Sequence, residues 1–437
     1  MKKQIVYRTF VPGMVILLFI ILSGCHDLDF PNPNAPVVED VPDQQLVTGA
    51  EAGMRVDYAI YLRVVGSLGR EVYYFEPADP RYTGNLLRGT PDPGGFLVER
   101  PWNGRYSVVR VCNELLKRAA NRSGADAAGL NGFAKTIKAY QLLLNLNYMD
   151  TNGIKIIQSD DITVPFASKT ESFNEIIRLL DEGNSDLAQA GGSFSFSLSS
   201  GFDGFNTPAT FAQFNRALRA RVAAYTQDWQ GVLDALAGSF IDPTAPMNKG
   251  VYHIYGTSLG DQTNEIFENP SAPFVKLMAH PSFQTDAEPG DMRFATKVVV
   301  RDLDENGVPD TTKFDNLSST MGVTITGGST DPFPIIRNEE LLLLRAEANI
   351  QLGNLSTAEA DINVVRNAAG LASVTLTDQA SAIDQLLHER RYSLFMEGHR
   401  WVDMRRYNRL DQLPTDRPDD VVLDKMPRPE TELPESG

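Results

Sequence analysis

The segment Leu387–Arg406 reads LHERRYSLFMEGHRWVDMRR and combines charged and aromatic residues more densely than an ordinary surface helix does. From Ile383 onward, apolar residues recur at spacings near three, four and seven, which places them on one face of a helix. Gly398 interrupts this pattern, and a glycine inside a helix costs about 1 kcal/mol relative to alanine unless a bend requires it. We therefore predict a helix, a bend and a second helix that Trp401 anchors.

The charged residues of this segment can form an ion network on the helix surface. Opposite charges three residues apart are neighbours on a helix. Examples here are Glu397 with Arg400 and Asp403 with Arg406. Both pairs are predicted members of a structural network.

Acid–base or metal chemistry is the competing interpretation of the same segment. It would pair Glu389 with Glu397 or Asp403 and would add His388 or His399. However, the segment lacks a His-Glu-x-x-His spacing, and its arginines compete for the carboxylates as ion-pair partners. The structural network is therefore preferred, and no catalytic or metal-ligating residue is predicted.

The segment resembles a pattern, ERR.EL..EG.RW.D..R, found near the C-terminus of the SusD/RagB family of surface lipoproteins, which capture nutrients, usually glycans, for an outer-membrane transporter. Upstream, Asn338–Arg366 resembles the family block E..L.RAEA...G....A...IN.VR..AG. Looser matches are Trp102–Asn113, Phe214–Ala237 and Pro427–Glu432, the last with arginine in place of the isoleucine of a PIP..E motif. The signature residues are Arg345, Glu347, Arg366, Glu389, Arg390, Arg391, Glu397, Gly398, Arg400, Trp401, Asp403 and Arg406.

This resemblance implies a mainly α-helical, SusD-like fold. In such a fold, tetratricopeptide-like helix hairpins form a scaffold that contacts a SusC-like TonB-dependent transporter. Irregular loops with short strands build the ligand face. Family members are binding proteins rather than enzymes, so the resemblance implies no cofactor.

The N-terminus has the pattern of a lipoprotein signal peptide over residues 1–24. A positively charged start precedes a short apolar run, about residues 11–22, and the sequence LSGC that ends at Cys25. This sequence resembles the bacterial lipobox, which implies that Cys25 carries the lipid anchor. Residues 25–43 contain prolines at alternate positions and are predicted to form an extended tether. We expect a location on the outer membrane, facing the cell exterior.

The chain is acidic, with 56 Asp and Glu against 40 Lys and Arg in 437 residues. Loss of residues 1–24, which carry three positive charges at Lys2, Lys3 and Arg8 and no negative ones, changes the formal charge from −16 to −19. Nucleic-acid binders need basic patches, so nucleic acid is not an expected partner. Attachment to a membrane should depend on the lipid rather than on charge.

The hydrophobic periodicity predicts mostly helices in a region 44–270 and a further helical region 271–437, which together form one compact unit. Short strands are expected between about residues 240 and 333. The predicted helices are 44–66, 102–120, 131–148, 172–190, 210–225, 228–237 and a hairpin that begins at Ile335 and pairs 338–349 with 356–366. The predicted strands are 250–255, 295–302 and 321–326.

Three local signals mark helix ends. Ser172 with Glu175 and Ser356 with Glu359 have the spacing of a capping box, in which each side chain binds the backbone of the other. Gly353 suits the C-terminus of the first helix of the hairpin.

The segment Asp302–Asp310 resembles a calcium loop. Its twelfth position is Lys313, however, where an EF-hand needs a bidentate glutamate. We therefore predict an Asn-Gly hairpin turn, with structural calcium as the alternative. Two other residues are assigned to the core: Cys112, which has no disulfide partner once Cys25 is lipidated, and Trp102.

Glycan capture needs flat apolar faces for the sugar rings and polar groups for their hydroxyls. Residues 73–85 form the richest loop-like stretch of this kind, although its tyrosines could instead cover the core. Further aromatic stretches hold Tyr252–Tyr255 and Phe202 with Phe205. The predicted ligand-binding residues are Tyr73, Tyr74, Arg81, Tyr82 and Asn85.

Three functions from different classes are compatible with the sequence. The first is a surface glycan-binding lipoprotein that delivers its ligand to a transporter. The second keeps that transporter but carries peptides or other nutrients. The third is a glycoside hydrolase, which needs two carboxyl groups roughly 5 to 10 Å apart. It ranks last because the only convergent acids lie in the arginine-rich segment.

Overall fold

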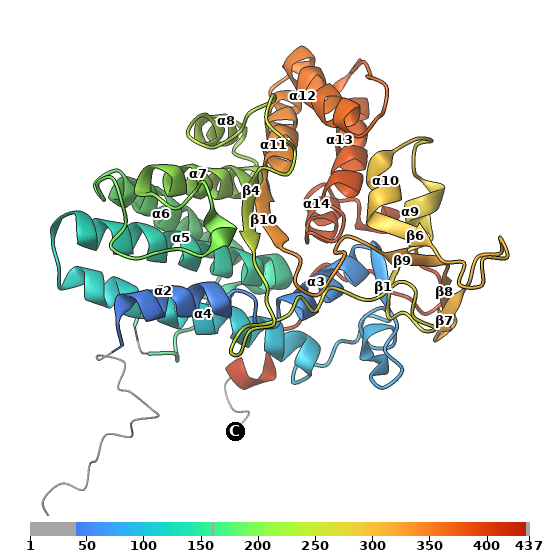
Figure 1. Ribbon diagram of the computed structural model, residues 1–437, viewed down its shortest axis with the longest axis horizontal. Helices are drawn as coiled ribbons and strands as arrows, with labels where there is room; N and C mark the ends of the chain where they lie inside the picture. The colour runs from blue at the N-terminus through green and yellow to red at the C-terminus, as the bar shows by residue number, and fades with distance from the viewer. Residues whose placement is uncertain (1–40, 160, 434–437) are drawn as a thin grey trace, which may run out of the picture. The chain divides into compact units, whose positions relative to one another are not determined.

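The N-terminal half of the chain consists mainly of helices that pack against their neighbours in sequence. In this computed structural model, which describes residues 41–159 and 161–433, α4, α5, α6, α7 and α8 contact one another in that order (Figure 1). The predicted signal peptide 1–24, Cys25 and the tether up to residue 40 lie outside the described residues. The chain divides into the units Met1–Gln45 and Leu46–Gly437, and all helices and strands from α3 onward belong to the second unit. The helices are α2 (Asp43–Gly53), α3 (Tyr58–Leu68), α4 (Phe96–Ala120), α5 (Gly124–Met149), α6 (Lys169–Leu187), α7 (Pro208–Tyr225) and α8 (Trp229–Ala237).

The prediction of one helix over residues 44–66 is wrong, because the helix ends after α2 and a second helix, α3, begins at Tyr58. Asp57 lies at the break with a φ of 55°, in the left-handed region that a continuing helix cannot use. The other predicted helices of this half are present, several with earlier starts. Pro101 lies inside α4, and the Leu97 carbonyl that its missing N–H leaves free accepts from the Tyr148 hydroxyl instead.

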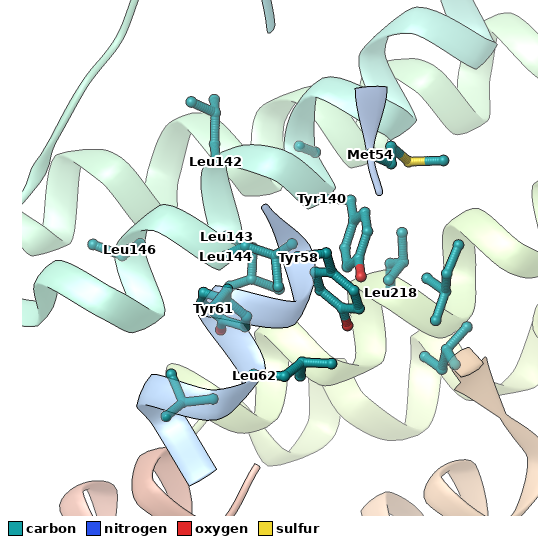
Figure 2. Close-up of a cluster of buried hydrophobic side chains, with 14 of the residues drawn as sticks. Met54, Tyr58, Tyr61, Leu62, Tyr140, Leu142, Leu143, Leu144, Leu146 and Leu218 are labelled. Carbon is teal, nitrogen blue, oxygen red and sulfur yellow. The ribbon is translucent and has the colours of Figure 1, made fainter. Parts of the chain in front are cut away.

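A core of leucines and tyrosines joins α3 to α5 and α7. Figure 2 shows Tyr58 and Tyr61 of α3 beside the leucines of α5, with Leu218 of α7 nearby. The rings of Tyr58 and Tyr61 are stacked at 5.9 Å, and Tyr61 lies 5.6 Å from Tyr148. This burial of apolar surface accounts for the fully buried α3 and fixes its position under the C-terminal helices.

Short antiparallel strands occupy the middle of the chain. A four-stranded sheet has the order β1-β5-β9-β6, and β4 pairs with β10 in a separate ribbon near the centre of Figure 1. Their bounds are β1 (Val72–Tyr74), β4 (Gly250–His253), β5 (Leu277–Ala279), β6 (Val298–Val300), β9 (Met321–Val323) and β10 (Phe333–Arg337). Smaller pairs join β2 (Ile154–Lys155) with β3 (Phe166–Ala167) and β7 (Thr312–Phe314) with β8 (Leu317–Ser319).

Three predictions in this region need correction. The predicted strand 295–302 is half helix, because α10 (Met292–Lys297) precedes β6, and a short helix α9 (Ser282–Thr285) lies before it. Ile335 belongs to β10 rather than to a helix. The predicted Asn-Gly hairpin is also wrong, since β6 pairs with β9 while β7 pairs with β8, so the strands flanking Asp302–Asp310 do not pair with each other.

The C-terminal helices confirm the predicted helix, bend and helix. The helix α13 (Gln379–Ser393) is followed by Gly398, with a φ of 84°, and then by α14 (Arg400–Arg406). The predicted hairpin is also present as α11 (Asn338–Gln351) and α12 (Leu355–Ala368), with Gly353 at a φ of 81° between them. Helical turns at Pro80–Tyr82, Asp150–Asn152, Ser200–Phe202, Leu410–Gln412 and Glu430–Glu432 complete the elements.

Both predicted capping boxes are wrong, although helices begin close to each. The box of α6 uses Ser168 and Glu171, one turn earlier than predicted, and the Ser172 hydroxyl donates to the Ser168 carbonyl instead. In α12, Asn354 is the N-cap residue, and Glu359 accepts a hydrogen bond from the amide of Leu376.

Candidate functional site

Arginine–carboxylate pairs hold the signature helices together. Arg390 of α13 donates to both oxygens of Asp403 on α14, at 2.7 and 3.1 Å. Arg406 donates to Asp403 at 3.0 Å and reaches Glu347 of α11. Burial alone would raise the pKa of Asp403, but Arg390 and Arg406 hold it below its ordinary value. The predicted Asp403–Arg406 pair is therefore confirmed as part of a buried network.

A second buried carboxylate, Glu389, lies between two arginines. Arg293 of α10 and Arg366 of α12 each donate to it at 2.6 Å. Arg345, by contrast, forms a local bidentate pair with Asp361, which joins α11 to α12. The signature thus connects α10, α11, α12, α13 and α14 through charge-assisted hydrogen bonds.

The predicted pair of Glu397 with Arg400 is not formed. Glu397 instead accepts from Arg337 at 2.7 Å, because the bend at Gly398 turns the two residues away from helical spacing. Trp401 is fully buried and its indole donates to the carbonyl of Leu423 at 2.7 Å, as expected for an anchor. Each of the three carboxylates that could have served in acid–base chemistry is therefore engaged by arginine.

The two histidines of this segment differ in how closely their neighbours hold them. His399 is buried and its Nδ1 lies 3.1 Å from the hydroxyl of Tyr225. Burial, followed by the charges of Arg221 and Arg390, keeps the pKa of His399 well below its ordinary value. His388 lies 3.4 Å from Glu288, at the edge of the network.

A pocket of about 470 Å³ opens beside this network and is the candidate ligand site. The ribbon of β4 and β10, the helix α10 and the turn after α13 supply its walls. Its apolar lining includes the half-buried ring of Tyr252 and the rings of Pro332 and Pro334. Tyr252 donates a hydrogen bond to the carbonyl of Asn248, which fixes the position of its phenol.

The charges that line this pocket are largely neutralised within the protein. Arg337 binds both Glu339 and Glu397. Lys297 donates to the carbonyls of Tyr392, at 2.7 Å, and Ser393, and burial lowers the pKa of Lys297 to about 8. The pocket can therefore offer hydrogen bonds without a large net charge.

Uncharged polar groups complete the lining of the pocket. The hydroxyl of Thr296 donates to the carbonyl of Met292 at 2.9 Å, and that of Thr324 donates to the carbonyl of Thr296 at 3.1 Å. Both hydroxyl oxygens keep lone pairs for a ligand. Apolar rings beside hydroxyl and amide groups suit a ligand that is rich in hydroxyls.

Tyr252 also lines a second pocket, of about 360 Å³. There Arg55 donates to Asp261 at 2.6 Å and to the carbonyl of Ile254. Burial raises the pKa of Glu51 to about 7 even though its carboxyl accepts from the amide of Ser199. Tyr252 is thus placed to contact a ligand in either pocket.

The five predicted ligand-binding residues lie elsewhere, and none of them lines these two pockets. Tyr73, Tyr74 and Tyr82 are buried, and the rings of Tyr74 and Tyr82 pack edge to face at 4.7 Å. Arg81 forms a bidentate pair with Asp79, and Asn85 is exposed. For the tyrosines, the structure favours the alternative in which they cover the core.

The other assigned residues occupy the expected positions. Trp102 is fully buried, and its indole donates to Glu432 at 3.0 Å. Cys112 is a buried free cysteine, and burial raises the pKa of its thiol to about 12. Phe202 and Phe205, by contrast, were considered for ligand contact but are buried in the core, where Phe202 also lines the second pocket.

The acidic loop brings three carboxylates together. Oxygens of Asp302, Asp304 and Asp310 lie within 4.8 Å of one another. Asp302 already accepts hydrogen bonds from the amides of Asn306 and Gly307, at 3.1 and 2.9 Å. Exposed acidic groups commonly gather in this way without a cation.

These features define a mainly α-helical scaffold with one large open pocket beside an arginine-locked C-terminal block. Residues 292–427 match the model of the SusD family. The C-terminal third of the chain thus matches the SusD family, and the fold of the chain is SusD-like. No curated protein sequence matches it.

Solved structures share this fold over most of the chain. Surface glycan-binding protein A from Bacteroides uniformis aligns with a TM-score of 0.63 and 16% identity, covering 84% of this chain and 88% of its own. A laminarin-binding SusD-like protein aligns with a TM-score of 0.61 and 17% identity, covering 88% and 96%. A structure from Bacteroides vulgatus, provisionally described as a sugar-binding protein, aligns with a TM-score of 0.61 and 20% identity. The alignment covers 86% of this chain and 88% of its own.

None of the helices within residues 41–159 and 161–433 combines the length and apolar character needed to cross a membrane.

Proposed function

We propose that this protein is a surface-exposed outer-membrane lipoprotein that binds glycans and delivers them to a SusC-like TonB-dependent transporter. The observation that carries the proposal is the SusD-like fold, because structures that share it include a surface glycan-binding protein and a laminarin-binding protein. The match of residues 292–427 to the SusD family supports association with the outer membrane. The lipobox supports anchoring through Cys25.

The glycan contacts in this proposal centre on Tyr252. Its half-buried ring offers an apolar face, while Thr296 and Thr324 offer hydroxyl groups and Asn248 an amide. Sugar rings stack on such faces and use their hydroxyls for hydrogen bonds. The same residue borders the second pocket, so an oligosaccharide could extend from one pocket towards the other.

The loop 73–85 is a second proposed contact region. Asn85 is exposed and Arg81 is partly exposed, so both can reach a ligand at the surface. Tyr73, Tyr74 and Tyr82 would contact it only if the loop opened, since all three are buried.

Peptide or other nutrient cargo is the alternative within the same transporter partnership. The pocket beside Tyr252 contains amide and hydroxyl groups that peptide backbones also recognise. A glycoside hydrolase would need one carboxyl group as acid and another as base or nucleophile. In the pocket, Glu339 and Glu397 share Arg337 as their partner, which favours binding over hydrolysis.

The test is a binding assay with the soluble chain that begins after Cys25. Polysaccharides and peptide digests are titrated against the wild type, Tyr252→Ala and Tyr252→Phe, and the products are checked for hydrolysis. We expect one class of glycan to bind, the Ala variant to lose at least fivefold in affinity, and the Phe variant to retain most of it. Phe274→Ala, which removes an exposed aromatic ring outside both pockets, is the matched control.

Peptide binding without glycan binding would select the alternative cargo, and glycan cleavage would select the hydrolase. The anchor is tested separately with the full chain. Cys25→Ser should release the protein from the outer-membrane fraction, and the wild type should copurify with its transporter. Retention of Cys25→Ser in that membrane would contradict the lipid anchor.

A further inference from the structure

A smaller pocket, of about 190 Å³, is lined by three arginines that come from separate parts of the chain. Arg70 follows α3, Arg391 lies in α13, and Arg400 begins α14. Asp286 is the one acidic residue among the residues that line it. Cations therefore exceed anions at this pocket, in a chain whose formal net charge is −16.

Two of the arginines are held by groups within the protein. Arg70 is almost fully buried, and it donates to the carbonyls of Ser67, Pro414 and Val421 at 3.0, 2.9 and 3.2 Å. These carbonyls orient Arg70. The carboxylates of Asp416 and Asp420, which do not line the pocket, partly offset its charge, although His280 and Arg417 also bind them. Arg70 therefore contributes a fixed, partly offset positive charge to the wall of the pocket.

Arg391 also lines this pocket, and two of its nitrogens donate hydrogen bonds to residues of the lining. One of its nitrogens donates to Asp286 at 2.6 Å and another to the hydroxyl of Ser282 at 2.7 Å. Asp286 is half exposed, with a side-chain accessibility of 51%, so water competes for this ion pair. Arg391 is thus only partly neutralised.

Arg400 differs from the other arginines of the signature. Those residues each bind a carboxylate, whereas no hydrogen bond or ion pair joins the Arg400 guanidinium to any residue within 41–159 and 161–433. Burial, and then the charge of Arg391, lowers the pKa of Arg400 to about 10, so the group stays charged at neutral pH. A half-buried cation with five donors and no acceptor is left facing the pocket.

The nearby carboxyl group of Glu71 does not compensate for this charge. Glu71 is fully buried, one of its oxygens accepts from the amide of Met396, and the other has no partner. Burial raises the pKa of Glu71 to about 8, so it is mostly neutral at pH 7.

We propose that this pocket binds an oxyanion, a carboxylate or sulfate group, with Arg400 as the principal ligand and Arg391 as the second. Planar guanidinium groups bind such anions through paired hydrogen bonds. The Ser282 hydroxyl and the side chain of Gln412 add neutral polar groups at the pocket. Its volume lies below that of typical sites for larger ligands, and it fits an anionic group with part of a sugar ring.

The anion could be a free inorganic ion or the acidic group of a sugar. The site stands apart from the pocket beside Tyr252, since the two share no lining residue. The inference therefore does not rest on the proposed function, and inorganic sulfate alone can test it.

The experiment is a calorimetric titration of the chain that begins after Cys25 with sodium sulfate, at an ionic strength held constant with sodium chloride. We expect Arg400→Gln to weaken sulfate binding at least tenfold. Arg110→Gln removes one positive charge from the exposed face of α4 and is the matched control, with unchanged binding expected. Thermal unfolding of each variant verifies that it is folded.

A variant that should gain affinity guards against loss through misfolding. Asp286→Asn removes the anion that competes for Arg391, so sulfate should bind several-fold more tightly. Glucuronate and glucose 6-sulfate then distinguish the two sources, because tighter binding than inorganic sulfate identifies an acidic sugar and equal binding a free anion. Both of these results support the site, provided that Arg400→Gln weakens the binding. Sulfate binding that is absent, or that Arg400→Gln leaves unchanged, overturns the proposal.

Discussion

Arg390 and Asp403 form a buried, two-point ion pair across the bend that joins α13 to α14. The guanidinium Nε and Nη2 donate to the two carboxylate oxygens at 2.7 and 3.1 Å, and both side chains are at most 3% exposed. The pair fixes the angle between two helices that Gly398 allows to turn. It therefore accounts for the dense charges in this segment: they add ion pairs to the apolar contacts of Trp401 and Val402, which anchor α14 in the core.

Removal of one partner from this pair should be strongly destabilising. We predict that Asp403→Ala lowers the free energy of unfolding by about 3–5 kcal/mol, because it leaves the Arg390 guanidinium buried without its carboxylate and leaves Arg406 with Glu347 alone. Urea denaturation of the wild type and variant, followed by far-UV circular dichroism, measures the difference.

An exposed pair provides the control for this measurement. Asp384 of α13 binds Arg409 but its side chain is 65% exposed, so Asp384→Ala should cost less than about 1 kcal/mol. Equal costs for the two substitutions would show that burial does not determine the contribution of the signature pair.

Gly398 should resist replacement because of its backbone conformation rather than for lack of space. Its φ is 84°, while an added Cβ would meet its nearest neighbour, a ring carbon of Tyr61, at an ordinary 3.5 Å. We predict that Gly398→Ala lowers the free energy of unfolding by about 1–2 kcal/mol. The cost should appear as a lower urea midpoint with an unchanged m value.

The same substitution at a second glycine should have the opposite sign. Gly49 lies exposed within α2, and an added Cβ there would meet no atom within 4 Å. Gly49→Ala should therefore stabilise by about 0.5–1 kcal/mol. If both variants shift the midpoint in the same direction, the conformational argument for Gly398 is wrong.

The helix, bend and helix of the signature could be predicted because periodicity and a single glycine are local signals. The partner of Glu397 could not. Either Arg400 or Arg337 could pair with Glu397 by charge. The bend moves Arg400 away from Glu397, whereas the fold places Arg337, at the end of β10, beside it. Long-range pairing depends on tertiary structure, which the spacing of charges along one helix does not contain.

The capping boxes failed for a different reason. Residues 168–175 read SKTESFNE, so the same Ser-x-x-Glu spacing occurs twice in succession at Ser168 and Ser172. The pattern fits both positions equally well, and packing selects the earlier one, where Phe173 can be buried within α6. A local motif that repeats within one turn cannot locate the helix start.

The ligand residues were the least predictable part of the chain. The candidate pocket collects side chains from several distant segments, and among them only Tyr252 lay in a stretch that the sequence singled out for ligand contact. Tyr73 and Tyr74 belong to β1, which the sheet and its neighbours bury on both faces. Consecutive aromatic residues are typical of such a strand and also of an exposed loop, so composition alone does not distinguish the two.

Glu71 should make the stability of the protein depend on pH. Its pKa is raised from 4.5 to about 8, chiefly by burial, so the folded state binds a proton that the unfolded state releases. Stability from this group is complete below pH 4.5 and falls by about 1.4 kcal/mol per pH unit until about pH 8. Glu71→Gln keeps the oxygen that accepts from Met396 and cannot ionise.

We therefore predict that Glu71→Gln matches the wild type near pH 5 and exceeds it in stability near pH 8. Urea unfolding at three pH values across this range measures the growing difference. Glu171, an exposed residue of the α6 capping box, serves as the comparison, since its pKa is lowered and it stays ionised throughout this range. A difference between Glu71→Gln and the wild type that stays constant with pH would contradict the buried proton.

Substitutions in the loop 73–85 should separate into two groups. Tyr73→Ala removes a ring that is 2% exposed and stacked on Phe75 at 5.4 Å, so it should lower the free energy of unfolding by about 3–5 kcal/mol. Asn85 lies on the surface, so Asn85→Ala should change stability by less than about 0.5 kcal/mol.

Loss of glycan binding in Tyr73→Ala would thus reflect a damaged core, whereas loss in Asn85→Ala, with stability intact, would identify a real contact. Thermal unfolding of each variant, measured beside its glycan affinity, distinguishes the two cases. If Tyr73→Ala unfolds at the wild-type temperature, its ring does not support the core as the structure indicates, and the loop again becomes the leading candidate for the ligand face.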